Sequence, residues 1–180
     1  MRKVICSMSP LLYLHRLNAL EFLPKLFDEV WVPTDVLEEL QRALFIGLDV
    51  PHLFDYDWIK YADPQGTLPS AWMAQELSAS DLVAMSLGFE IPEAVILVDD
   101  GQARKSGKVA GLVIWGTLQV LLEAKAAGLI KRLAPYVNRM DTEMGMWLSD
   151  KTRERILRLA HEDEAGSDGS LTTAPLKERE

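Results

Sequence analysis

The chain has 180 residues, enough for one domain with a substantial core but too few for two domains of ordinary size. Hydrophobic residues make up 48% and charged residues 26%, which excludes a wholly disordered, collagen-like or disulfide-stapled chain. The formal net charge of −8 argues against a surface built for tight, sequence-independent binding of nucleic acid.

The N-terminal half alternates short apolar runs with helical patterns. We expect a buried strand over residues 3–6, then a helix with Pro10 in its first turn, and a second helix over residues 19–26. A second strand over residues 29–32 leads into a helix opened by Pro33, with Val36, Leu37, Leu40 and Leu44 on its inner side. The segment 47–69 is irregular, with a short strand around residues 58–61.

The C-terminal half continues the alternation. We expect a helix over residues 78–87, a strand over 94–98, a helix over 101–109 and a strand over 112–115. The unbroken apolar run of the strand at 94–98 indicates burial on both faces of a sheet. Thr117 is expected to cap a helix that ends near Ala127 and is closed by Gly128, followed by helices over 135–146 and 151–161.

This order of elements predicts an α/β fold, a three-layer α/β/α domain with a mainly parallel central sheet. We expect one domain over residues 1–161, with a helical extension from about residue 131. Residues 162–180 carry six acidic and two basic side chains and are expected to form a disordered acidic tail. The longest apolar run, residues 109–122, is too short to cross a membrane. The single cysteine, Cys6, indicates a reducing, cytoplasmic setting.

Several polar side chains follow the predicted strands or begin the helices after them. Ser7 follows the first strand, and Asp99 and Asp100 follow the strand over 94–98. Asp81 begins the middle helix, and Glu39 lies in the helix after the second strand. A parallel sheet can bring these elements to one end, where ligands bind. Clustered carboxylates repel one another unless a cation joins them, and oxygen ligands favour Mg²⁺ or Mn²⁺.

Ordinary structural roles compete with this interpretation. Ser78 and Asp81 have the spacing of a helix-capping box, and acidic residues such as Asp99 and Asp100 complement a helix dipole. Glu38 is expected to lie on a solvated face. His15 is expected at the surface or partly buried, and Cys6 in the core. The aromatic residues between Phe54 and Tyr61 either stack on bases or pack within their loop.

The sequence resembles PIN-domain proteins, in a subgroup related to VapC-type toxins. The resemblance covers about residues 2–130. It is carried by VICSMSPLLYLHRLNALEFLPKLF, VWVPTDVLEEL, LSASDLVAMSLG and ILVDDGQARKSGKVAGLVIWGTLQVLLEAKAAGLI.

The resemblance implies a ribonuclease site dependent on Mg²⁺ or Mn²⁺ and built from about four acidic residues. By position, Glu39, Asp81, Asp99 and Asp100 match those acids, with Asp100 closer than Asp99 to the general pattern. Arg104 and Thr117 fall where the subgroup places polar residues near the site. Arg104, Lys105 and Lys108 either contact an RNA backbone or form a solvated helix face. An antitoxin protein and a second copy of the chain are the partners that the resemblance suggests.

One position departs from the family pattern. The first acid of most active PIN nucleases falls here on Ser7, a neutral and weaker ligand. Two hypotheses follow: a metal-dependent endoribonuclease that Ser7 assists as a weak or water-mediated ligand, and an inactive PIN-like module that binds a protein or RNA. A third hypothesis, a small-molecule site, lacks support because the chain has no glycine-rich phosphate loop.

Overall fold

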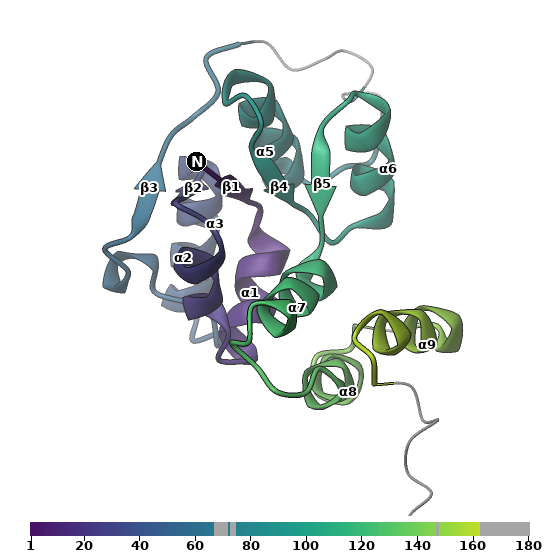
Figure 1. Cartoon of the computed structure of the whole chain (residues 1–180). Coiled ribbons are helices and arrows are strands. Elements are labelled where there is room, and N and C mark those ends of the chain that lie inside the picture. Colours follow the sequence, from purple (N-terminus) through teal and green to yellow (C-terminus); the bar gives the residue numbers. More distant parts are fainter. Residues whose placement is uncertain (67–71, 73–74, 147, 163–180) are drawn as a thin grey trace, which may run out of the picture.

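In the computed structural model, which describes residues 1–66, 72, 75–146 and 148–162, five parallel strands form one central sheet (Figure 1). In chain order they are β1 (Lys3–Cys6), β2 (Glu29–Val32), β3 (Ile59–Tyr61), β4 (Val95–Leu97) and β5 (Val113–Trp115). Their spatial order is β3-β2-β1-β4-β5. The direction of winding reverses between β1 and β4, and such a reversal places a ligand crevice beyond the carboxyl ends of those two strands.

Helices cover both faces of the sheet. They are α1 (Met8–Arg16), α2 (Leu23–Leu26), α3 (Thr34–Phe45), α5 (Ala79–Glu90), α6 (Gly101–Val109), α7 (Thr117–Ala126), α8 (Ala134–Thr142) and α9 (Asp150–Leu159), with short 3-10 turns η1 (Leu20–Phe22) and η2 (Leu53–Asp55). Among the helices of the described residues, none is long and apolar enough to cross a membrane.

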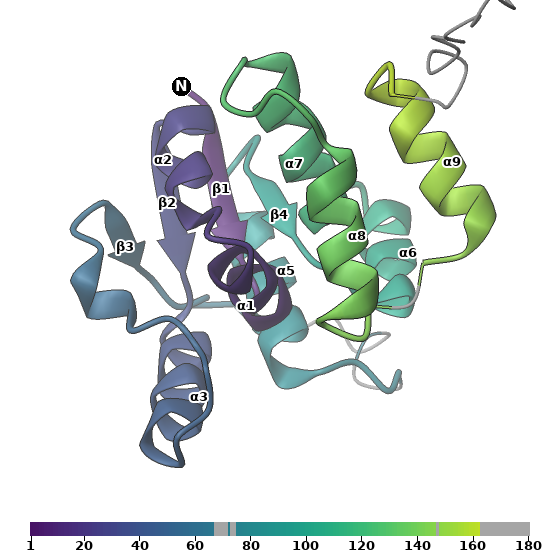
Figure 2. The same ribbon diagram turned by 90° about the horizontal axis from the view of Figure 1, so that it is seen from below.

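Alternation along the strands divides the core into two layers. Val4 and Cys6 of β1 pack into a cluster with residues of α1, α2 and α7, whereas Ile5 packs into a second cluster with residues of α5 and α6. Figures 1 and 2 show α8 and α9 on the side of the molecule away from β3, and α9 contacts α7. The expected three-layer α/β/α fold is therefore confirmed.

Most expected elements are present at or near their expected bounds. The strands over 3–6 and 29–32 and the helix over 101–109 have the expected limits. All three residues of β4 are buried, as expected for a strand covered on both faces. Cys6 lies in the core, where burial raises the pKa of its thiol, and His15 is partly exposed beside Asp49.

Some details of the helices differ from expectation. The helix expected over 19–26 is divided into η1 and α2, because Pro24 occupies the first turn of a new helix, where its missing N–H costs nothing. Leu44, expected on the inner side of α3, is 39% exposed, and Ala43 is buried instead. The expected cap at Thr117 is Gly116, and α8 ends at Thr142 rather than at residue 146.

The segment after α3 adds the edge strand of the sheet. The short strand expected near residues 58–61 is β3, which pairs in parallel with β2. The aromatic rings pack against one another, Phe54 on Tyr61 and Tyr56 on Trp58. These contacts are consistent with packing within the segment, although Phe54 remains 59% exposed. Residues 67–69 of the expected irregular segment lie outside the described residues.

Glu162 joins the C-terminal extension to the core. Its carboxylate accepts hydrogen bonds from the backbone N–H groups of Leu133, at 2.6 Å, and Ala134, at 2.9 Å, and from the ammonium of Lys125 on α7. Burial raises its pKa, but these donors outweigh burial and hold the pKa below its usual range. Glu162, expected as the first residue of a disordered tail, thus belongs to the folded part, whereas 163–180 lie outside the described residues.

Glu162→Ala will lower the free energy of unfolding by about 2–3 kcal/mol, because two backbone donors and one ammonium lose their acceptor. Urea denaturation measures the change. Glu154→Ala, at an exposed position of α9, is the control and will have no effect. Equal midpoints for the two variants would show that Glu162 does not anchor the extension.

Candidate functional site

Ser7 lies at the carboxyl end of β1, at the point where the winding of the sheet reverses. Its backbone N–H donates to the Leu97 carbonyl at 3.1 Å, which extends the pairing of β1 with β4. Ser7 is fully buried, although its side chain does not cap α1. Its Oγ has no hydrogen-bond partner of good geometry among the described residues, although the hydroxyl is close enough to Asp81 to favour the charged carboxylate. A polar atom inside the fold is therefore available for a ligand shared with Asp81.

Asp81 presents a second unpartnered oxygen beside Ser7. Its backbone N–H donates to the Ser78 hydroxyl at 3.1 Å, so Ser78 caps α5 and the Asp81 carboxylate is not needed for that purpose. Asp81 is 4% exposed, and its Oδ1 lacks a hydrogen-bond partner in the described structure. Burial raises its pKa and the Asp100 charge adds to this effect, while the nearby hydroxyls of Ser78 and Ser7 oppose it.

Asp99 follows β4 and is held by the first residue of α7. One carboxylate oxygen accepts the Thr117 N–H at 2.8 Å and the other accepts the Thr117 hydroxyl at 2.6 Å. Burial raises the pKa of Asp99, and the Asp81 charge raises it further, whereas the bonds from Thr117 and the Arg104 charge lower it. Thr117 therefore serves as the positioning donor of Asp99.

Gly116 makes room for this arrangement. A Cβ atom at this position would lie 2.9 Å from Oδ1 of Asp99 and 3.5 Å from a guanidinium nitrogen of Arg104. Any larger residue would displace the carboxylate from Thr117. Sequence reasoning missed Gly116, since the only signal was a glycine directly before the expected helix.

Asp100 both caps a helix and contributes charge to the site. Its Oδ1 accepts the Ala103 N–H at 2.7 Å at the start of α6. Its side chain is exposed, and its charge is close enough to raise the pKa of Asp81. Asp100 therefore caps α6 and also lies close enough to Asp81 to influence the charge of that carboxylate.

The structure thus places Ser7, Asp81, Asp99 and Asp100 at one end of the sheet, where the charge of Asp81 acts on Asp99 and that of Asp100 acts on Asp81. Thr117 is hydrogen-bonded to Asp99, and the charge of Arg104 acts on the same carboxylate. Glu39 lies half-buried on α3, which contacts α5, but within the described residues no hydrogen bond or ion pair links Glu39 to these acids. Lys105 is exposed on α6.

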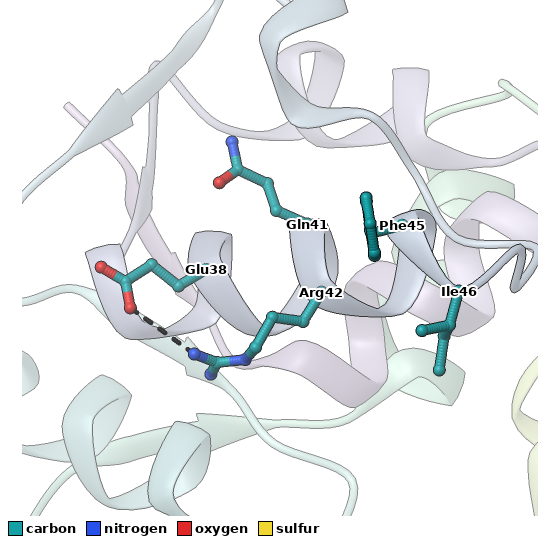
Figure 3. A pocket seen from close by; sticks show the side chains of 5 residues that line it. All are labelled: Glu38, Gln41, Arg42, Phe45 and Ile46. Carbon is teal, nitrogen blue, oxygen red and sulfur yellow. Dashed lines mark ion pairs between the residues drawn. The ribbon is translucent and has the colours of Figure 1, made fainter.

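A separate hollow on α3 does not include any of the predicted site residues. It is lined by Glu38, Gln41, Arg42, Phe45 and Ile46 (Figure 3). Glu38 forms an ion pair with Arg42 at 3.7 Å on the exposed helix face, as expected for a solvated residue. Phe45 is 92% exposed and Ile46 is 71% exposed, so this end of α3 is an apolar surface.

The donor set suits a hard cation that keeps part of its water shell. Throughout the described part of the chain, no group of three or more His, Cys, Asp or Glu side chains is close enough to hold an ion by itself. Mg²⁺ is commonly bound by one or two carboxylates together with water and substrate phosphates. The unpartnered oxygens of Asp81 and Ser7, beside two further aspartates, fit this kind of site.

Comparison with known families identifies the fold. The family model DUF3368, described as a PIN domain, matches residues 3–162. No match to a curated protein was found. The PIN domain has a nuclease-like fold, and PIN domains generally use divalent metal ions and often bind RNA. The match covers most of the chain, which therefore belongs to the PIN-domain family.

Proposed function

We propose that the protein is a metal-dependent endoribonuclease that uses Mg²⁺ or Mn²⁺. The observation that carries this proposal is the pair of buried, unpartnered oxygens on Ser7 and Asp81 beside Asp99 and Asp100. Buried polar atoms in folded proteins normally have partners, so this pair indicates a missing ligand. The family membership supports a nuclease.

Different residues of the chain would hold the ion, orient its ligands and supply positive charge. Asp81 and Asp100 would hold the ion, with Ser7 and Asp99 completing its surroundings, and Glu39 would join as a more distant carboxylate. When bound, the ion supplies charge stabilisation to the phosphodiester and lowers the pKa of water. Thr117 fixes the orientation of Asp99, and Arg104 adds positive charge on the side where a phosphate would approach.

Asp81→Asn will reduce metal-dependent cleavage of single-stranded RNA at least 100-fold, because it removes the charge of a buried carboxylate whose Oδ1 has no hydrogen-bond partner in the described structure. Wild-type cleavage will require added Mg²⁺ or Mn²⁺ and will stop with EDTA. Asp57→Asn, an exposed position before β3 at the opposite edge of the sheet, is the matched control and will retain full activity. Cleavage by Asp81→Asn at the wild-type rate would contradict the assignment.

A second candidate function is an inactive PIN-like module that binds a protein or RNA. Ser7 in place of an acid favours it, because a neutral ligand weakens the hold on a cation. Metal titration by calorimetry distinguishes the two. Saturable Mn²⁺ binding that is lost in Asp81→Asn supports the enzyme, and absence of binding together with absence of cleavage supports the module.

The biological setting is also a proposal. The resemblance to VapC-related proteins suggests a cytoplasmic toxin of a toxin–antitoxin pair, with an antitoxin protein as partner and a homodimer as the assembled form. The apolar end of α3 carries Glu38 and Arg42 beside Phe45 and Ile46. Opposite charges flanking an apolar patch suit a self-complementary contact between two copies.

A further inference from the structure

A cleft of about 630 Å³ lies between α9 of the C-terminal extension and the end of β4. Asp99, at the end of β4, lies in its wall, followed by residues of α6, β5 and α7. The opposite wall comes from α9, through Thr152, Arg155, Ile156 and Leu159. The cleft therefore leads from the candidate site to a helix of the extension, which lies beside α7 in Figures 1 and 2.

The cleft is positively charged although the chain is acidic. Three of its lining residues are cationic, Arg104 and Lys108 on α6 and Arg155 on α9, and only Asp99 is anionic. Within the described structure, none of these three side chains forms a hydrogen bond or an ion pair within 4.0 Å. Arg104 acts electrostatically on Asp99, but Lys108 and Arg155 have no carboxylate partner among the described residues, and this excess of positive charge favours an anionic ligand.

Most of the remaining lining side chains are apolar, whereas Gln119 and Thr152 are polar. The apolar ones are Ile114, Trp115, Leu118, Met146, Leu148, Ile156 and Leu159. Single-stranded nucleic acid combines charged phosphates with flat, apolar base faces, and proteins bind it through positive grooves with apolar or aromatic surfaces. The cleft also adjoins Asp99, at the candidate site for phosphodiester cleavage. This position, together with the positive charge and the apolar side chains, favours RNA over an acidic peptide.

We propose that this cleft binds a single-stranded RNA segment next to the cleaved phosphate, and that Arg155 of α9 is one of its phosphate-binding residues. The inference rests on the proposed ribonuclease function, which it deepens by assigning the C-terminal extension to substrate binding. Arg104 and Lys108 contact the strand from α6, while Arg155 contacts it from the opposite wall.

Binding of a fluorescein-labelled single-stranded RNA, followed by anisotropy in EDTA, tests the assignment without cleavage. Arg155→Gln will weaken binding roughly tenfold at low salt and reduce the slope of log Kd against log salt by about 0.7, the loss of one phosphate contact. Arg158→Gln removes the same charge from an exposed position of the same helix that does not line the cleft, and it will bind like the wild type. Arg155 is exposed and unpaired, so its variant will melt at the wild-type temperature.

The possible outcomes separate this inference from the ribonuclease proposal. If the wild type cleaves RNA and Arg155→Gln has the wild-type Kd and KM, the assignment of the cleft is wrong but the ribonuclease proposal is supported. If the wild type binds RNA through Arg155 but never cleaves it, the ribonuclease proposal is wrong but RNA binding by the cleft is supported. Competition by oligoglutamate as effective as that of unlabelled RNA would overturn the choice of RNA.

Discussion

Ser7→Asp will make the metal-free protein less stable and its stability strongly dependent on Mg²⁺. Ser7 is fully buried, and its hydroxyl is close enough to the Asp81 carboxylate to lower the pKa of that group. A new carboxylate there adds a buried negative charge beside three others, with no cation to offset it. We expect a loss of about 3 kcal/mol in the free energy of unfolding at neutral pH.

Mg²⁺ will restore most of this loss, because a bound cation stabilises the folded state in proportion to its affinity for it. Urea denaturation in EDTA and in millimolar Mg²⁺ measures both effects. Ser7→Asn is the matched control, since asparagine has the size of aspartate without its charge and reports the cost of crowding alone. If Ser7→Asp and Ser7→Asn unfold at the same urea concentration in both buffers, Ser7 does not lie in a cation site.

The sequence allowed the sheet and the positions of several candidate site residues relative to the strands to be predicted, because both depend on local patterns. Apolar runs marked the strands, and parallel topology placed Ser7, Asp99 and Asp100 beyond the carboxyl ends of adjacent strands. Only the structure shows that Oδ1 of Asp81 has no hydrogen-bond partner among the described residues. From the sequence, the spacing of Ser78 and Asp81 could be explained by helix capping alone.

Contacts between distant segments could not be predicted. The bond between Asp99 and Thr117 depends on the register of β4 against β5, which no local pattern specifies. The need for glycine at position 116 follows from the same contact. Arg155 has an ordinary exposed-helix pattern, and only the placement of α9 beside the cleft distinguishes it from Arg158.

Asp99 will make the metal-free protein less stable as the pH rises, because burial raises its pKa. Between the ordinary aspartate pKa of about 3.9 and the raised value in the folded state, the folded protein keeps a proton that the unfolded chain releases. The free energy of unfolding therefore falls as the pH rises through this window and becomes constant above it. Asp81, whose pKa burial also raises, acts in the same direction.

Asp99→Asn will remove the part of this decrease in the free energy of unfolding that Asp99 causes. At neutral pH the variant will be at least as stable as the wild type. Asparagine keeps both contacts with Thr117, because a hydroxyl can accept as well as donate. Asp99→Ala will instead cost about 1–3 kcal/mol, since it leaves the buried N–H and hydroxyl of Thr117 without their acceptors. Urea midpoints in EDTA, from about pH 4 to about pH 8, measure the slope. If the urea midpoint of Asp99→Asn falls with pH as steeply as that of the wild type, burial of the Asp99 carboxylate does not cause the fall.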